Sequence, residues 1–104
     1  MNFTKLDNTG LHKVNGTSLR GYVLTTYDKL VETFGEPTYL GSYDEKTTCE
    51  WFIEFEDGTV ATIYDWKTGG TPMYPYEWHI GGKNNKVVGL IQAINNSLSL
   101  TTSL

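Results

Sequence analysis

The stretch that decides the fold is residues 50–66, which read EWFIEFEDGTVATIYDW. Apolar and polar residues alternate on both sides of the Asp57-Gly58 pair, and a period of two is typical of half-buried β-strands. Asp-Gly between two such runs favours a hairpin with a two-residue turn. With Asp57 and Gly58 at the centre of the turn, the expected cross-strand pairs are Phe55 with Val60, Ile53 with Thr62, and Trp51 with Tyr64.

These three pairs share one face of the hairpin, which we expect to belong to the core. The opposite face then has Glu54 and Glu56 near the turn, and Phe52 and Ile63 farther from it. A face that mixes carboxylates with large apolar residues is only partly covered. We therefore expect a helix to lie over Phe52 and Ile63.

Two amphipathic helices are predicted, one before and one after this hairpin. Helical spacing (i, i+3, i+4, i+7) in the first places on one side Tyr27, Leu30, Val31 and Phe34. Thr25 or Thr26 supplies its N-cap, and Gly35 and Pro37 end it. The same spacing in the second helix, with Asn84 or Asn85 as N-cap, aligns Val87, Leu90, Ile91 and Ile94.

Two further patterns predict strands. The Asn15-Gly16 pair indicates a second hairpin, in which residues 11–14 pair with residues 17–20. Residues 77–80 form a strand that Gly81 and Gly82 end. Together these elements predict an α+β fold: a mainly antiparallel β-sheet with two α-helices packed on one face.

The chain has 104 residues, the size of one domain. We expect residues 1–96 to form a single compact α+β domain, and residues 97–104, rich in Ser and Thr, to form a loosely ordered tail. A chain of this length buries enough surface to build a core without metals or disulfides.

Charge and hydropathy exclude several classes of partner. Twelve acidic and eight basic residues give a net charge of −4, so we expect no direct nucleic-acid binding. We expect no membrane segment, because no run approaches the roughly 20 apolar residues that a membrane helix needs. Residues 1–5 lack the apolar centre of a signal peptide, and Cys49 is the one cysteine, so we expect a soluble protein of a reducing compartment.

Catalytic motifs are not recognised in the sequence, and we expect no enzymatic activity, no cofactor and no metal site. Cys49 comes just before a strand, where a small packing side chain is the ordinary role of a thiol. His12 and His79 have no partner at metal-ligand spacing. His79 is expected to be a structural histidine or a polar contact to a ligand.

Aromatic residues crowd into positions 64–78, which contain five Tyr and Trp residues. Tyr and Trp are frequent where proteins bind partners or stack on rings, although they also cover small cores as a lid. We expect the binding surface to be formed by Trp66, Lys67, Tyr74, Tyr76, Trp78 and His79.

Acidic residues dominate residues 44–65, where seven acids and one base give a local charge of −6. Such a patch favours docking on a basic protein or mimicry of nucleic-acid phosphates, and otherwise protects a solvated sheet edge. The expected secondary acidic surface consists of Asp44, Glu45, Glu54 and Glu56.

Three blocks of sequence carry a resemblance: TTYDKLVETFGEP at residues 25–37, EWFIEFEDGTVATIYDWK at residues 50–67 and WHIGG at residues 78–82. In their order they resemble a family of small, mostly uncharacterised accessory proteins common in bacteriophage genomes. The resemblance assigns no catalytic residues. It implies a viral accessory protein in the host bacterial cytoplasm, of a kind that often disables a host factor, including immune effectors and their nucleotide signals.

The resulting hypothesis is a non-enzymatic, phage-encoded binding protein that antagonises a host factor, in particular an antiviral defence. It inhibits a host protein through the anchors Trp66, Tyr74 and Tyr76, or it sequesters a nucleotide-like small molecule. In the second case a base stacks between aromatic rings and the phosphates are held by Arg20, Lys67 or Lys83. The alternatives are a small nucleotide hydrolase that uses the carboxylates and His79, an acidic nucleic-acid mimic, and a minor virion component. The oligomeric state stays open.

Overall fold

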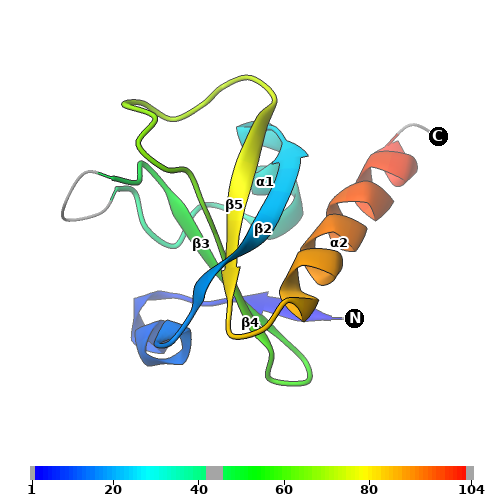
Figure 1. Ribbon diagram of the computed structural model, residues 1–104. Coiled ribbons are helices and arrows are strands. Elements are labelled where there is room, and N and C mark those ends of the chain that lie inside the picture. The colour runs from blue at the N-terminus through cyan, green and yellow to red at the C-terminus, as the bar shows by residue number, and fades with distance from the viewer. Residues whose placement is uncertain (1, 42–45, 103–104) are drawn as a thin grey trace.

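The computed structural model describes residues 2–41 and 46–102 and contains one five-stranded sheet, in which every pairing is antiparallel. The strand order is β1-β3-β4-β5-β2, so β1 and β2 form the edges (Figure 1). In chain order the elements are β1 (Phe3–Lys5), the 3₁₀ helix η1 (Asn8–Val14), β2 (Ser18–Thr25), α1 (Tyr27–Phe34), β3 (Glu50–Phe55), β4 (Val60–Tyr64), β5 (Tyr76–Gly82) and α2 (Lys86–Thr102). The α+β prediction is confirmed.

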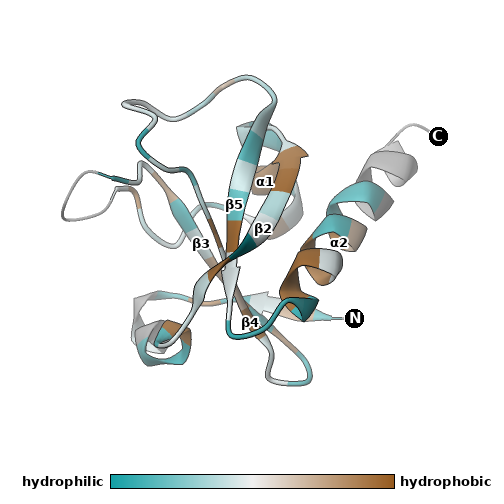
Figure 2. Ribbon diagram, in the orientation of Figure 1, coloured by the Kyte–Doolittle hydropathy of each residue, from teal (hydrophilic) through white to brown (hydrophobic). Residues whose placement is uncertain are grey.

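The main core lies between the sheet and the two α-helices. Leu30 and Phe34 of α1 and Val87 and Ile91 of α2 are buried in it. The strands contribute Val23, Trp51, Ile53, Phe55, Ala61, Ile63, Trp78 and Ile80. Figure 2 shows the change from hydrophilic residues in the β5–α2 connection to hydrophobic residues in the first turn of α2. Both helices therefore cover one face of the sheet, as the sequence predicts.

The capping residues that the sequence predicts at the helix ends are found in the structure. The Thr26 hydroxyl accepts a hydrogen bond from the Lys29 N–H (3.2 Å), which makes Thr26 the N-cap of α1. The backbone of Gly35 has a φ of 86°, which glycine adopts without strain. Before α2, the Asn84 side-chain oxygen accepts from the Lys86 N–H (3.0 Å).

Helix α2 continues to Thr102, although the sequence predicts a loosely ordered tail from residue 97. Ser and Thr cost only a few tenths of a kcal/mol per residue in a helix, and an established helix propagates easily, so this composition does not stop it. Among the helices that the structure describes, none combines the length and the apolar character needed to span a membrane.

The β3–β4 hairpin is present, but its turn differs from the expected two-residue turn. A type I′ turn needs positive φ at both central residues, and here Gly58 has a φ of 87° while Asp57 does not have positive φ. Phe55 binds both sides of the loop, because its C=O accepts from the Gly58 N–H (2.9 Å) and its N–H donates to the Thr59 C=O (2.8 Å). Residues 56–58 therefore form a three-residue loop that ends in a left-handed glycine.

This loop shifts the register by one residue and turns every β4 side chain to the other face. Trp51 pairs with Ile63, and Phe52 pairs with Thr62. Ile63 enters the helix-covered core, whereas Thr62 and Tyr64 lie on the opposite face. The predicted pairs, and the prediction that Thr62 and Tyr64 face the core, are wrong.

The sequence predicts that a helix packed on the sheet covers Phe52, but other residues cover it in the structure. It belongs to a second, smaller cluster with Leu6 and Val60, which Val14 of η1 and Tyr39 adjoin. This cluster covers one end of the sheet face opposite α1 and α2. We call the rest of that face the open face, and no helix of the described residues lies over it (Figure 1).

The predicted hairpin of residues 11–20 is also wrong. Residues 11–14 belong to η1, and β2 begins only at Ser18. Asn15 has φ −60° and ψ 135°, and Gly16 has φ 83°, which is the geometry of a type II turn. A hydrogen bond from the Thr17 N–H to the Val14 C=O (3.2 Å) closes it. The Asn-Gly pair thus joins a 3₁₀ helix to a strand. Only Gly16 needs a positive φ in this turn, whereas the hairpin turn expected from the sequence needs it at both residues.

We predict that Gly58→Val lowers the free energy of unfolding by about 1–3 kcal/mol, because a β-branched residue is strained at positive φ. No atom lies within 4 Å of the added Cβ, so the cost is one of backbone conformation. Gly70→Val is the matched control, because Gly70 has equal space but no positive φ, and it should change stability by less than about 0.5 kcal/mol. Chemical denaturation measures both, and equal midpoints for the two variants would exclude the turn.

We predict that Phe34→Ala lowers the free energy of unfolding by about 3–5 kcal/mol, because its ring is enclosed in the core. Phe34 is 4% exposed, and its ring centre lies 5.1 Å from that of Phe3. Glu32→Ala, on the exposed side of the same helix, should stay within about 0.5 kcal/mol. A loss below about 1 kcal/mol for Phe34→Ala would contradict its place in the core.

Candidate functional site

A row of polar and aromatic side chains crosses the open face of the sheet. Glu50 of β3 pairs with Tyr64 of β4, Tyr64 pairs with His79 of β5, and His79 pairs with Tyr22 of β2. The ring centres of Tyr64 and His79 lie 5.3 Å apart, and those of Tyr22 and His79 lie 5.0 Å apart. The register of the strands therefore brings four residues that are distant in sequence to one level of one face.

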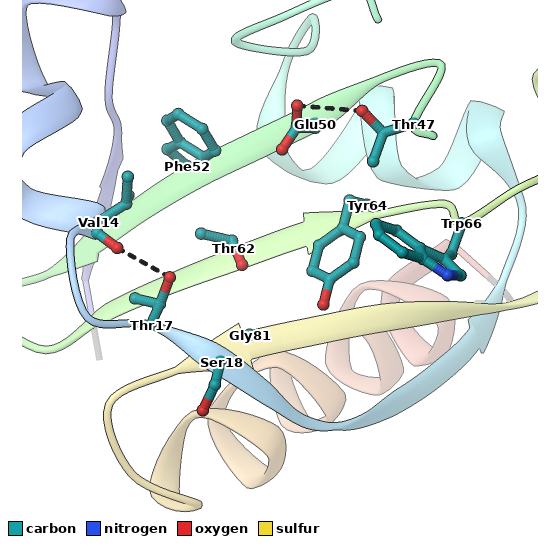
Figure 3. A pocket seen from close by; sticks show the side chains of 10 residues that line it. All are labelled: Val14, Thr17, Ser18, Thr47, Glu50, Phe52, Thr62, Tyr64, Trp66 and Gly81. Carbon is teal, nitrogen blue, oxygen red and sulfur yellow. Dashed lines mark hydrogen bonds between the residues drawn. The ribbon is translucent and has the colours of Figure 1, made fainter. Parts of the chain in front are cut away.

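A hollow of about 250 Å³ lies beside this row. Its floor includes Thr62 and Gly81, a cross-strand pair. A Cβ on Gly81 would collide with the Thr62 hydroxyl and lie 3.5 Å from the Tyr64 ring, so the missing side chain leaves this space open. Figure 3 shows the rings of Tyr64 and Trp66 at one end and Val14 at the other. The lining is completed by Thr17, Ser18, Thr47, Glu50 and Phe52.

Trp66 forms the rim of the hollow and is 43% exposed. The ammonium groups of Lys46 and Lys67 lie 5.6 and 5.9 Å from the centre of one of its rings, within the range of cation–π attraction. A hydrogen bond from the Lys67 N–H to the Lys46 C=O (2.7 Å) joins the two segments that carry these cations. Two ammonium groups thus lie beside the indole.

A buried carboxylate, that of Asp65, holds this rim in place. Asp65 is fully buried and accepts hydrogen bonds from the Thr48 N–H (2.7 Å), the Thr48 hydroxyl (2.6 Å) and the Thr68 hydroxyl (2.6 Å). The backbone N–H of the next residue, Trp66, donates a hydrogen bond to the Tyr76 hydroxyl (3.3 Å). Several charge-assisted bonds at one side chain make the connection after β4 rigid where it carries Trp66.

Burial sets the protonation of the groups around the hollow. It raises the pKa of the Tyr64 phenol above its usual value, so at neutral pH this hydroxyl keeps its proton and can donate. Burial also lowers the pKa of His79, which is therefore a neutral imidazole at neutral pH. The Nδ1 atom of His79 is buried and has no hydrogen-bond partner. The Tyr64 hydroxyl therefore offers a hydrogen bond at the hollow without adding charge, whereas the Nδ1 atom of His79 is enclosed beside it.

Cys49 is fully buried, and burial raises the pKa of its thiol to about 11. At neutral pH the sulfur is therefore protonated and weakly nucleophilic. This supports the packing role that the sequence indicates.

The six sequence-predicted binding residues do not share one location. Trp66 lines the hollow at its rim, and Lys67 lies beside the Trp66 ring. Tyr76 and His79 do not line the hollow but contact residues that do, namely Trp66 and Tyr64. Tyr74 is 61% exposed in the β4–β5 connection but does not line the hollow. The sequence alone could not predict which of these residues lie at the hollow, because the same residue types occur at every location.

The sequence predicts that Trp78 belongs to the binding surface, and the structure corrects this prediction. It is fully buried on the helix-covered face, where its ring packs edge-on against Trp51 with centres 5.6 Å apart. Alternation along β5 explains this, because Trp78 and Ile80 point into the core while His79 points to the open face. Trp78 therefore offers no surface to a partner.

Glu54 and Glu56 are the two residues of the predicted acidic surface that the structure describes. Glu54 forms an ion pair with Lys13 (2.9 Å), and Glu56 is exposed in the β3–β4 turn. Asp44 and Glu45 lie outside the described residues.

The proposed phosphate ligands Arg20 and Lys83 do not line the hollow. The Arg20 guanidinium donates to the backbone oxygens of Gly82 and Lys83, both at 2.9 Å, and so fixes the connection between β5 and α2.

Sequence reasoning missed several residues of the site, namely Tyr22, Glu50, Thr62, Tyr64 and Gly81. The alternation of residues in β3 and β4 could have identified those that lie on these two strands, if the register had been predicted correctly. With a three-residue turn, the same alternation pairs Tyr64 with Glu50 and Thr62 with Phe52, all on the face opposite the helices.

We predict that Asp65→Ala lowers the free energy of unfolding by about 2–4 kcal/mol, because it leaves buried donors without their acceptor. It should also increase the quenching of tryptophan fluorescence by acrylamide, since the segment that carries Trp66 loses its anchor. Glu77→Ala removes an exposed acid on β5 and should leave both readings unchanged. Equal stability of the two variants would show that Asp65 does not hold this segment.

Comparison of the chain with protein-family models, with curated proteins and with solved structures finds no match. The resemblance to phage accessory proteins therefore stays an expectation. The geometry of the open face is what bears on the function.

Proposed function

We propose that this chain is a non-enzymatic binding protein that holds a small ligand in the hollow of its open face. The observation that carries the proposal is the wall formed by Tyr64 and Trp66 beside the polar groups of Glu50 and Thr62. Aromatic faces stack on flat rings, and a few fixed polar groups orient them. None of these four side chains belongs to the helix-covered core.

The size and chemistry of the hollow favour a single ring system. Its volume of about 250 Å³ is below the range of roughly 300–1,000 Å³ that is common for drug-sized ligands. The ligand would therefore insert one flat, polar group between Tyr64 and Val14, while the rest of it stays near the rim.

The biological role that we propose is antagonism of a host factor in the bacterial cytoplasm, in particular sequestration of a nucleotide-derived signal of antiviral defence. The resemblance to phage accessory proteins supports this role. Binding without turnover is supported by the protonated Cys49 thiol and by the Asp65 carboxylate, which is buried and fully engaged with backbone and hydroxyl donors.

A second candidate function is inhibition of a host protein, and a separate observation favours it. Met73 and Tyr74 are adjacent in the β4–β5 connection and are 64% and 61% exposed. Large exposed side chains of this kind are typical anchors in protein interfaces. The two candidates therefore use different parts of the same connection.

We predict that Trp66→Ala abolishes retention of the small ligand, with a loss of at least about 2 kcal/mol in binding free energy, because it removes the rim of the hollow. Purified protein is incubated with a bacterial small-molecule extract and washed, and the molecules released by heat are identified by mass spectrometry. Tyr74→Ala is the matched control, because it removes an exposed aromatic ring of the same connection outside the hollow.

Loss of the ligand in Trp66→Ala alone supports the hollow as the site. If Tyr74→Ala loses a bound host protein while neither variant changes small-molecule retention, the protein inhibitor replaces this proposal. A nucleotide that is recovered in hydrolysed form, at a rate that depends on His79, would establish the hydrolase alternative instead.

A further inference from the structure

Two hydroxyl groups of β4, those of Thr62 and Tyr64, line the hollow without a hydrogen-bond partner. Neither is bonded to any group within residues 2–41 and 46–102. Figure 3 shows both oxygens on the side of β4 that faces β5 and Gly81. A Cβ on Gly81 would collide with the Thr62 hydroxyl and lie 3.5 Å from the Tyr64 ring. The space beside the two hydroxyls is therefore the place of this missing side chain.

Both hydroxyls are able to donate and to accept. Burial raises the pKa of the Tyr64 phenol, so it keeps its proton at neutral pH, and Thr62 is only 6% exposed. A hydroxyl donates one hydrogen bond and accepts up to two. Because enclosed polar groups are normally hydrogen-bonded, two unpaired hydroxyls at one hollow indicate polar groups on a ligand. Ligand hydroxyls match them best, since these also donate and accept.

The aromatic wall of the hollow favours a saturated ring. The planes of Tyr64 and Trp66 lie at 74° to each other, with ring centres 6.4 Å apart. A flat base can stack on only one of two rings at this angle. A sugar ring carries C–H bonds that point in several directions, and weakly positive hydrogens are attracted to aromatic faces. A sugar can therefore contact both rings of the wall at once.

We infer that the group held in the hollow is a sugar ring with two neighbouring hydroxyls. In a nucleotide-derived ligand this ring is the ribose, whose 2′- and 3′-hydroxyls bond to the hydroxyls of Thr62 and Tyr64. The base and the phosphate stay outside the hollow, near its rim. The inference rests on the proposed function, because it names the part of the ligand that the same hollow holds.

Phenylboronate resin tests the inference, because it binds molecules that carry two neighbouring cis hydroxyls. A bacterial small-molecule extract is passed through the resin, and the purified chain is incubated separately with the flow-through and with the eluate. The molecules released by heat are identified by mass spectrometry. The chain should retain a ligand from the eluate and none from the flow-through. Retention from the flow-through, alone or equally, would overturn the inference.

Thr62→Val and Tyr64→Phe each remove one hydroxyl and keep the shape of the side chain. Each should weaken binding of the molecule recovered from the boronate eluate by about three- to tenfold, the loss expected for one neutral hydrogen bond. Equilibrium dialysis with detection by mass spectrometry measures this affinity. Thermal midpoints should not change, because neither hydroxyl is bonded within the described part of the fold.

Tyr22→Phe is the matched control, because Tyr22 lies on the same open face but does not line the hollow. It should leave the affinity unchanged. If all three variants bind the molecule from the eluate as tightly as the natural chain does, the inference is overturned.

The mass of the recovered molecule distinguishes the two sources of such a ring. A nucleobase in it supports the ribose, and a sugar without a nucleobase overturns the nucleotide source. If Trp66→Ala loses a ligand that comes only from the flow-through, the sugar inference fails and the proposed function stands. If Trp66→Ala retains the extract ligand, the proposed function fails as well.

Discussion

The three-residue loop at residues 56–58 is the constraint on which the rest of the structure depends. Gly58 takes the positive φ that ends the loop, and Phe55 is hydrogen-bonded on both sides of it. A loop of two residues would pair the same strands one position out of register. Because side chains alternate with a period of two, that change would exchange the buried and the open residues of β4.

The same constraint links stability to the candidate site. In the observed register Ala61 and Ile63 complete the core under α1 and α2, and both are fully buried. Thr62 and Tyr64 then lie on the open face, where the glycine at position 81 leaves a hollow between them and β2. One turn thus determines which residues stabilise the fold and which remain available to a ligand.

Much of the fold could be predicted from the sequence, because its strongest signals are local. The helical spacing that ends at Phe34, the cap at Thr26 and the stop at Gly35 all act within one or two turns of helix. Register could not be predicted in the same way, because Asp-Gly is compatible with both a two-residue and a three-residue loop. The Asn15-Gly16 pair illustrates the same ambiguity, since a type II turn uses it as well as a hairpin does.

The candidate site was only partly predictable, because it depends on contacts between distant segments. Aromatic density pointed to the β4–β5 connection, where Trp66 lines the hollow and Lys67 lies beside the Trp66 ring. The burial of Trp78 follows from strand alternation once β5 is placed beside β4. The anchoring of the rim by Asp65 joins residues 17 positions apart, and composition alone carries no signal for it.

Cross-strand nuclear Overhauser effects between α-protons of β3 and β4 test the central claim most directly, because these protons approach closely only in opposed residues that are not hydrogen-bonded to each other. The observed register predicts a strong effect between Phe52 and Thr62, which are paired. A strong effect between Ile53 and Thr62 in its place would establish the two-residue turn, return Tyr64 to the core face and contradict the hollow as a binding site.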